Sequence, residues 1–492
     1  MSEQMQTRKI VLRPLERPAV AESSKPSPVL GALTLGILTL ILALAPLPLG
    51  SARPLPWSVL ALAAAVLLVV AVLAEFLDPA PSFLLRPLRI PLAFMALVFA
   101  WIVFQMLPTG LALPYASIWS MAQDVLGTAL SPSISIDRYQ SAADLLHLLT
   151  YVAIFFAAWR AARDGESARF LLRAIGWIGA IYALYGIIVY SLGNGTILWL
   201  HKWAYREDLT GTFVNRNSFA TFLGLTLVCN LASLSELFAR RIDTSSRRTK
   251  ILSAFESIFS QGLWTALRII LIGGALLLTH SRGGAISTLI AIAVVSLLIM
   301  RAPSFRGAWR TPLVVATILG VCLVGIAGGA GLLARFETTA ISADGRATVY
   351  VETMQAIKEH PIFGTGLGTF QFVYPTYQTP DISAFYDLAH DDYLENTLDL
   401  GIPAALVFFA ALALLAAQCL RGVFGRRRDA IYPGIAFAAT VLVGAHAVVD
   451  FSLQIPAVAV LYAAILGMGV AQSVSTSSRR DTSLALPGGT RS

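Results

Sequence analysis

Long apolar runs recur along this chain of 492 residues, and they constrain its fold more than any other feature. A run of about 20 apolar residues is long enough for a helix to cross the hydrocarbon core of a membrane. Only 13 % of the residues are charged, whereas a soluble domain needs about 25 % to cover its surface, so most of this surface must face lipid. The runs lack the alternation of an outer-membrane barrel, and backbone groups in lipid must be satisfied within each segment. The sequence therefore predicts an all-α polytopic membrane protein.

Twelve membrane spans are predicted from these runs. They lie near residues 29–49, 57–77, 90–108, 146–163, 169–191, 218–238, 265–280, 284–300, 311–332, 402–420, 432–449 and 454–472. The predicted parts of the chain are a cytoplasmic tail (1–28), nine spans (29–332), one large external loop with short helices (333–401), three spans (402–472) and a second cytoplasmic tail (473–492). No cleavage site for a signal peptide is clear, so the first apolar run is predicted to be retained as a span.

The distribution of basic residues predicts the orientation of these spans. With the N-terminus inside, 27 of the 36 lysines and arginines fall on the cytoplasmic side, as the positive-inside rule requires. The arginine runs at 240–241 and 426–428 both fall inside, and removing any one span would place later basic clusters outside. We therefore expect both termini in the cytoplasm, and we attribute the net charge of +8 to these loops rather than to a nucleic-acid surface.

Some function classes are disfavoured by what the sequence lacks. No G-x-x-x-x-G-K-[ST] loop occurs, which argues against an ATP-driven function. The three cysteines, Cys229, Cys322 and Cys419, each fall within an apolar run and have no metal-site spacing, so we interpret them as packing residues. The absence of an internal sequence repeat counts against a duplicated transporter.

Two polar groups lie where predicted helices meet the external face. In the first, Arg216 lies between Asn215 and Asn217 at the start of the sixth span, an arrangement that can hold an anionic head group. The alternative is an arginine that snorkels toward lipid phosphate. In the second, His280 and Arg282 lie in the tight turn between the seventh and eighth spans, where glycines allow close backbone approach. A simple polar turn is the alternative there.

Two further polar groups lie in the large external loop. Arg346 opens a stretch with apolar residues at helical spacing, and a glycine-rich segment follows over residues 361–370. That segment lacks the preceding strand of a dinucleotide fingerprint, so a turn between loop helices is predicted instead. Later in the loop, His390 is followed by Asp391 and Asp392, and a histidine beside carboxylates suits general-base work. The alternative is a solvated histidine ahead of ordinary charges in the first turn of a helix.

No metal site is predicted at this histidine, because adjacent side chains diverge on a helix and no His-x-x-x-His pair occurs to complete a zinc site. His446 and Asp450 are spaced to share one helix face at the external end of the eleventh span. We interpret them as a structural pair that closes the bundle, somewhat ahead of a catalytic role.

Three arginines from separate elements and one candidate base together suit a lipid-linked pyrophosphate, because arginines can bind the charge that develops on a departing phosphate. At this point the chain resembles the O-antigen ligase and polysaccharide polymerase family of bacterial inner membranes. The resemblance rests on Gly-Thr-Phe-Val-Asn-Arg-Asn at 211–217, Ser-Arg-Gly-Gly at 281–284, the glycine-rich stretch at 361–368 and His-Asp-Asp-Tyr-Leu-Glu at 390–395.

The resemblance implies a GT-C-like, multi-pass enzyme of the bacterial inner membrane whose external loop is periplasmic. It implies a metal-independent and cofactor-independent inverting transfer of a glycan from undecaprenyl pyrophosphate to a hydroxyl acceptor on a glycan or lipid. The implied partners are this donor, the acceptor, membrane lipids and polysaccharide assembly proteins, with no nucleic acid.

The resemblance also implies roles for particular residues. His390 takes the position of the catalytic base and Arg346 that of the loop arginine. The family often has asparagine after this histidine, so Asp391 is expected to share or tune the base. The implied pyrophosphate contacts are Arg216 and Arg282, with Asn215, Asn217 and His280 beside them.

These motifs do not separate an O-antigen ligase from a surface or exopolysaccharide polymerase, or from a protein O-glycosyltransferase. A rival prediction from another class is a multi-span transporter of solutes or lipid-linked glycans. A transporter would have two related halves and polar residues at mid-membrane, whereas this chain gathers its conspicuous polar residues at the external interface. A peptidoglycan-type polymerase ranks lower, because its loop would need a catalytic aspartate in a different context.

Overall fold

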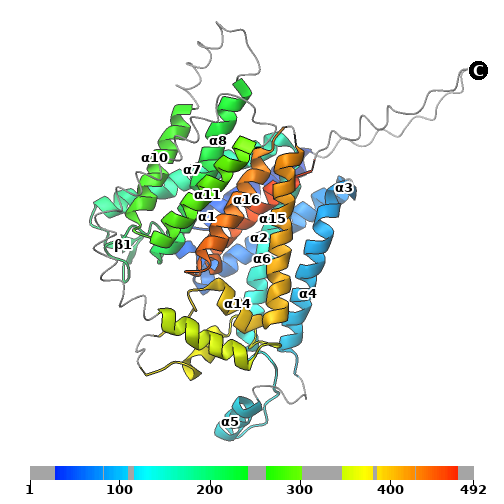
Figure 1. The fold of residues 1–492 in the computed structure, drawn as a ribbon, viewed down its shortest axis with the longest axis vertical. Helices are drawn as coiled ribbons and strands as arrows, with labels where there is room; N and C mark the ends of the chain where they lie inside the picture. Colours follow the sequence, from blue (N-terminus) through cyan, green and yellow to red (C-terminus); the bar gives the residue numbers. More distant parts are fainter. Residues whose placement is uncertain are drawn as a thin grey trace, which may run out of the picture.

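The computed structural model describes residues 28–80, 82–108, 116–241, 262–301, 346–380, 385–426 and 428–474. Helices make up nearly all of the regular structure in these ranges (Figure 1). The one sheet in the described part is a hairpin in which β1 (Thr196–Ile197) pairs antiparallel with β2 (Leu200–His201). The predicted all-α class is therefore confirmed for the described residues.

The long helices follow the apolar runs. They are α1 (Pro28–Leu44), α2 (Pro54–Leu77), α4 (Arg89–Met106), α6 (Arg138–Ala161), α7 (Gly165–Ser191), α8 (Arg216–Arg241), α10 (Leu263–Leu278), α11 (Arg282–Arg301), α15 (Ile402–Gly425), α16 (Ile431–His446) and α17 (Pro456–Ala471). The short elements are α3 (Ser82–Leu85), α5 (Ala116–Leu126), α13 (Phe370–Val373), α14 (Asp392–Leu400), the 3-10 turns η1 (Leu49–Ser51), η2 (Arg86–Leu88), η5 (Tyr374–Thr376) and η6 (Ser452–Gln454), and a helix over residues 346–359.

Seven of these helices are long and apolar enough to cross a membrane, and four shorter apolar helices accompany them. Together they coincide with eleven of the predicted spans. The predicted ninth span, 311–332, lies outside the described residues. The total of twelve spans and the complete 333–401 loop therefore stay predictions, whereas the multi-pass character of the chain is supported directly.

Local sequence explains where several helices begin. Asp137 and Asp164 cap α6 and α7, because their side chains accept hydrogen bonds from backbone N–H groups of the first turn. Proline lies in the first turn of α2, α15 and α17, where its missing N–H is not needed.

Helix α17 lies at the centre of the bundle, and all of its residues are buried. It packs against α6, α16, α8, α15 and α1. Its glycines allow this close approach: a Cβ on Gly467 would lie 2.4 Å from the carbonyl oxygen of Phe155, and one on Gly469 would lie 2.1 Å from the Cβ of Ala436. Helix α17 is apolar on every face and protein surrounds it, so the other helices of the bundle pack around it.

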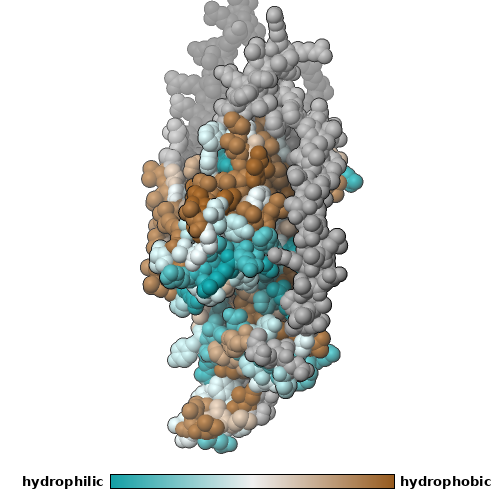
Figure 2. Space-filling view, turned by 90° about the vertical axis from the view of Figure 1, so that its left-hand side faces the viewer, coloured by the Kyte–Doolittle hydropathy of each residue, from teal (hydrophilic) through white to brown (hydrophobic). Residues whose placement is uncertain are grey.

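The two ends of the bundle differ in chemistry. At one end, Arg160 of α6 makes ion pairs with Glu75 and Asp78 at the end of α2, at 3.1 and 3.0 Å. At the other end lie the hairpin, α14 and the 346–359 helix (Figure 1). Figure 2 shows the face that carries α7, α10 and the hairpin. The residues on this face are mostly hydrophobic along the helices, and a band of hydrophilic residues lies below them. The candidate site lies at this second end.

Candidate functional site at the polar end of the bundle

The polar groups picked out from separate parts of the sequence meet at one end of the fold. Ser281 Oγ donates a hydrogen bond of 2.8 Å to Asn217 Oδ1, which joins the turn before α11 to the start of α8. A Cβ on Gly283 would lie 3.4 Å from His446 Nε2, so the same turn also packs against the end of α16. Helix packing thus brings together residues more than 200 positions apart.

The two loop motifs dock on the segment that follows α16. The backbone N–H of Asp392 donates to the carbonyl oxygen of Ala447 at 2.9 Å, and Arg346 Nη1 donates to that of Val449 at 3.1 Å. Three of the four predicted groups therefore contact residues 446–450, and the group around Arg216 is joined to them through Ser281.

His390 faces the carboxylate of Asp450, and its Nδ1 lies 3.4 Å from Asp450 Oδ1. The Phe451 ring lies 4.8 Å from the imidazole, and the Tyr350 hydroxyl donates to the His390 carbonyl oxygen at 2.9 Å. His390 has a φ of +57°, a left-handed conformation that is uncommon for residues with a side chain and is often kept at functional sites. The surroundings thus fix both the backbone and the ring of this histidine.

Asp450 is 1 % exposed. Burial by itself raises the pKa of this carboxyl, but His390, His446 and the backbone N–H of Phe451 favour the charged form and hold the pKa below its usual value. The site therefore contains a buried carboxylate that stays ionised beside an imidazole.

The side chains of Asp391 and His446 have other partners than the sequence predicts. Asp391 follows His390, but its side chain caps α14 by accepting from the N–H groups of Tyr393 and Leu394, at 2.8 and 2.9 Å. The interpretation of His446 and Asp450 as a pair on one helix face differs from the structure, because α16 ends at His446. His446 Nδ1 lies 3.1 Å from Ser452 Oγ instead.

A second buried carboxyl, that of Asp392, lies close to Asp450. Asp392 is 4 % exposed, and its Oδ1 accepts a hydrogen bond of 3.0 Å from Gln454 Nε2. Burial, aided by the neighbouring charges of Asp450 and Asp391, raises the pKa of Asp392 to about 8 against the opposing hydrogen bond. The two buried acids thus differ in character: Asp450 favours its charged form and Asp392 its neutral form.

The predicted phosphate-binding arginines approach from two sides. Arg216 begins α8, and its guanidinium carbon lies 5.6 Å from the centre of the Tyr205 ring. Burial and the charge of Asp450 raise the pKa of Tyr205, whereas Arg216 and Arg346 oppose that shift. Tyr205 is therefore within electrostatic reach of both arginines and of the carboxylate that faces His390. Arg282 begins α11 next to Gly283, on the side of the bundle that packs against His446.

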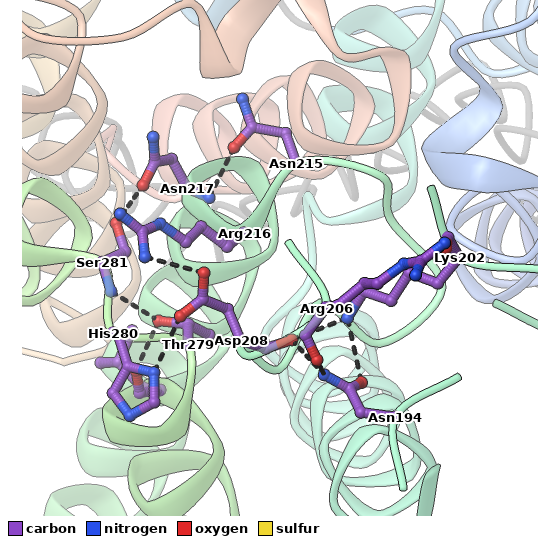
Figure 3. Close-up of polar contacts among 11 residues, drawn as sticks. Asn194, Lys202, Arg206, Asp208, Asn215, Arg216, Asn217, Thr279, His280 and Ser281 are labelled. Carbon is purple, nitrogen blue, oxygen red and sulfur yellow. Dashed lines mark hydrogen bonds and ion pairs between the residues drawn. The ribbon is translucent and has the colours of Figure 1, made fainter. Parts of the chain in front are cut away.

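Asp208 is a central residue of the site that the sequence reasoning missed. Its Oδ2 accepts from Arg216 Nη1 and its Oδ1 lies close to His280 Nδ1, each at 2.8 Å (Figure 3). The only local signal was an acidic residue shortly before the motif at 211–217, and nothing in the sequence relates it to His280, which is 72 positions away.

A buried lysine holds Asp208 in place. Lys202 is 2 % exposed, and its Nζ donates to Asn194 Oδ1 at 2.9 Å and to the Asp208 carbonyl oxygen at 2.7 Å. Asn194 Nδ2 donates to the same carbonyl oxygen at 2.9 Å. Burial lowers the pKa of Lys202 to about 8, although Asp208 acts in the opposite direction. These contacts make the loop before α8 a rigid support (Figure 3).

The two predicted asparagines are structural in this arrangement. Asn215 Oδ1 accepts from the backbone N–H of Asn217 at 2.8 Å at the start of α8, and Asn217 Oδ1 accepts from Ser281. Both side chains therefore hold the backbone around Arg216.

The glycine-rich segment forms the predicted turn. Gly364, Gly366 and Gly368 all have positive φ values. A Cβ on Gly364 would lie 2.4 Å from the carbonyl oxygen of Asp399, so the turn packs directly on the backbone of α14. The turn supports the helix that follows His390.

Within the described ranges, no group of three or more His, Cys, Asp or Glu residues is arranged to hold a metal ion. The predicted independence from metal and cofactor stays a prediction.

A family model described as O-antigen ligase matches residues 267–409. The matched region runs from α10 into α15 and includes Arg282, Arg346 and His390, whereas Arg216 and Asp450 lie outside it. A comparison with curated proteins gave no match. The family resemblance seen in the sequence is thereby confirmed.

Proposed function

We propose that this membrane protein, whose residues 267–409 belong to the O-antigen ligase family, transfers a glycan from undecaprenyl pyrophosphate to a hydroxyl acceptor. The family match supports a membrane glycosyltransferase of O-antigen ligase type. The donor, the acceptor and the mechanism are our proposal. The observation that carries it is the imidazole of His390 facing the buried carboxylate of Asp450, at the same end of the bundle as Arg216, Arg282 and Arg346.

The chemical step is a single displacement at the anomeric carbon. His390 Nδ1 faces Asp450, so Nε2 is the atom that accepts the proton from the attacking hydroxyl. The acceptor oxygen forms its bond to the anomeric carbon while the bond from that carbon to the pyrophosphate oxygen breaks. The electron pair leaves with undecaprenyl pyrophosphate, and the anomeric configuration inverts. Asp450 orients the ring and stabilises the imidazolium that forms.

The arginines stabilise the charge that develops on the leaving group. Guanidinium groups bind phosphate oxygens in two-point contacts and keep their charge at every relevant pH. Arg346 lies on the His390 side through its contact with Val449, and Arg216 lies over the Tyr205 ring. We assign both, with Arg282, to the pyrophosphate. Asp391 acts on the base indirectly, by capping the helix that follows His390.

We further propose that the site faces the periplasm, with both termini in the cytoplasm. The large number of basic residues in the predicted cytoplasmic loops supports this orientation. The acceptor is a glycan or lipid hydroxyl, and polysaccharide assembly proteins are its expected partners.

The test is a transfer assay with purified protein in lipid nanodiscs and lipid-linked glycan isolated from the producing cells. We expect His390→Ala to reduce transfer by at least about 10²-fold, the lower end of what a general base contributes. His201→Ala is the matched control, because that histidine is exposed on β2. Full activity of His390→Ala would disprove the assignment, as would an EDTA-sensitive activity that magnesium restores.

A deletion strain then separates the possible acceptors. Loss of long chains with single repeats intact indicates a polymerase, and loss of all polymer from the lipid A core indicates a ligase. Unchanged surface glycans would favour a transporter of other solutes.

A further inference from the structure

We infer that His280 and Asp208 form a second imidazole–carboxylate pair, which binds a sugar hydroxyl of the lipid-linked glycan through His280 Nε2. The inference rests on the proposed function and names a subsite for the donor sugar. It also replaces the sequence-based expectation that His280 contacts the pyrophosphate.

The geometry determines which ring nitrogen meets the ligand. An ionised carboxylate can only accept hydrogen bonds, so the proton of the imidazole lies on Nδ1, 2.8 Å from Asp208 Oδ1. Nε2 is on the opposite side of the ring, away from Asp208 (Figure 3). The side chain of His280 is 35 % exposed, compared with 10 % for Asp208. The pair therefore has a buried, fixed side and an accessible nitrogen.

Asp208 is shared between His280 and Arg216. Arg216 pairs with the other oxygen of the same carboxylate at 2.8 Å, so the charge of Asp208 is already balanced. A neutral ring with its proton on Nδ1 has a lone pair on Nε2 and accepts hydrogen bonds there. Phosphate oxygens are themselves acceptors and would be repelled by that lone pair. A hydroxyl group can donate to it, so a sugar fits this nitrogen better than a phosphate does.

The pair is held rigidly, as a recognition site must be. The backbone N–H of Leu209 donates to the carbonyl oxygen of Leu278 at 3.0 Å, which joins the Asp208 loop to the end of α10. His280 has a φ of +51°, and strained backbone of this kind persists where the surroundings enforce it. The contacts of Lys202 hold the other side of the loop.

The position of the pair suits a sugar bound next to the reacting carbon. Ser281, the next residue, is bonded to Asn217, and Arg216 connects Asp208 to Tyr205. Tyr205 in turn lies within electrostatic reach of Asp450, the partner of His390. A glycan on the pyrophosphate held by Arg216 would thus lie next to His280, because both side chains contact the carboxylate of Asp208.

The experiment compares the binding of two lipids to the protein in nanodiscs. One is undecaprenyl pyrophosphate without sugar, and the other is the lipid-linked glycan isolated from the producing cells. We expect His280→Phe to weaken binding of the glycan-bearing lipid about three- to tenfold, the loss of one neutral hydrogen bond. Binding of the bare lipid should change less than twofold. His280→Gln, which keeps an acceptor oxygen, should recover most of the loss.

Asp208→Asn tests the positioning role. An amide can donate to Nδ1 and turn an N–H outward at Nε2, and it removes a negative charge beside Arg216. We expect weaker binding of the glycan-bearing lipid and equal or tighter binding of the bare lipid, whereas a structural defect would weaken both.

Three results would overturn the inference. Equal weakening of both lipids by His280→Phe would make His280 an anion contact. If His280→Phe left the binding of both lipids unchanged, His280 would not contact the donor sugar. A raised KM for the acceptor with unchanged donor binding would place the hydroxyl on the acceptor. In each case the wild-type protein still binds the glycan-bearing lipid, so the proposed function stands; wild-type protein that binds neither lipid would disprove both.

Discussion

Asp450→Asn is the substitution that most directly tests how the site works. The asparagine has the same size and leaves His390 in place. It removes the carboxylate that faces Nδ1, and its amide N–H can donate to Nδ1 instead. The imidazole would then carry its proton on Nε2, the atom that must accept the proton of the attacking hydroxyl.

The expected loss follows from the geometry of the pair. General-base catalysis contributes about 10²- to 10⁴-fold, and the 3.4 Å between Nδ1 and Oδ1 is longer than a strong charge-assisted hydrogen bond. We therefore expect kcat to fall by roughly 10²- to 10³-fold, which is about 3–4 kcal/mol of transition-state stabilisation. The donor KM should change by less than about threefold, because Asp450 is not assigned to the donor.

The assay measures initial rates of transfer over a range of donor concentrations. Asp387→Asn is the control, because Asp387 is an exposed aspartate in the segment that carries His390. The pKa of Asp450 is lowered in the folded protein, so its contribution to stability is present above the unfolded pKa of about 3.9 and is lost as pH falls through the folded value. The asparagine variant lacks this contribution at neutral pH, so its thermal unfolding is measured there to check that it is still folded. An unchanged kcat, or a loss seen entirely in the donor KM, would refute the role of the pair.

Two further predictions concern the supports of the site. Asp392→Asn should raise the unfolding temperature at pH 8–9 and leave it nearly unchanged at about pH 4, where the carboxyl is close to its unfolded pKa of about 3.9. Because the folded pKa of about 8 is higher, the stability that the acid form contributes is lost progressively as pH rises from about 4 to 8. A scan of unfolding temperature against pH checks this, and a lower temperature throughout would contradict it. Gly364→Ala should destabilise the fold by about 2 kcal/mol or more, because its Cβ would meet the Asp399 carbonyl oxygen at 2.4 Å. Gly127→Ala, also at positive φ but with open space around it, isolates the backbone strain; equal losses in both variants would rule out the steric cause.

The positions of the apolar helices could be predicted from the sequence, because the free-energy cost of placing polar groups in lipid applies to each segment separately. Eleven predicted spans coincide with apolar helices for this reason. The sequence also drew attention to Arg216, Arg282, Arg346 and His390, because polar groups stand out one by one in so apolar a chain, and their roles stay predictions.

The sequence by itself thus determined the class of fold, the resemblance to the O-antigen ligase family and most of the charged residues proposed for the site. Only the tertiary structure decided their partners. His390 is followed by Asp391 but faces Asp450, 60 positions later, and Asp208 joins Arg216 to His280 across two helices. The physical reason is that hydropathy and helix capping are local properties, whereas the pairing of buried charges depends on which helix ends the packing around α17 brings together.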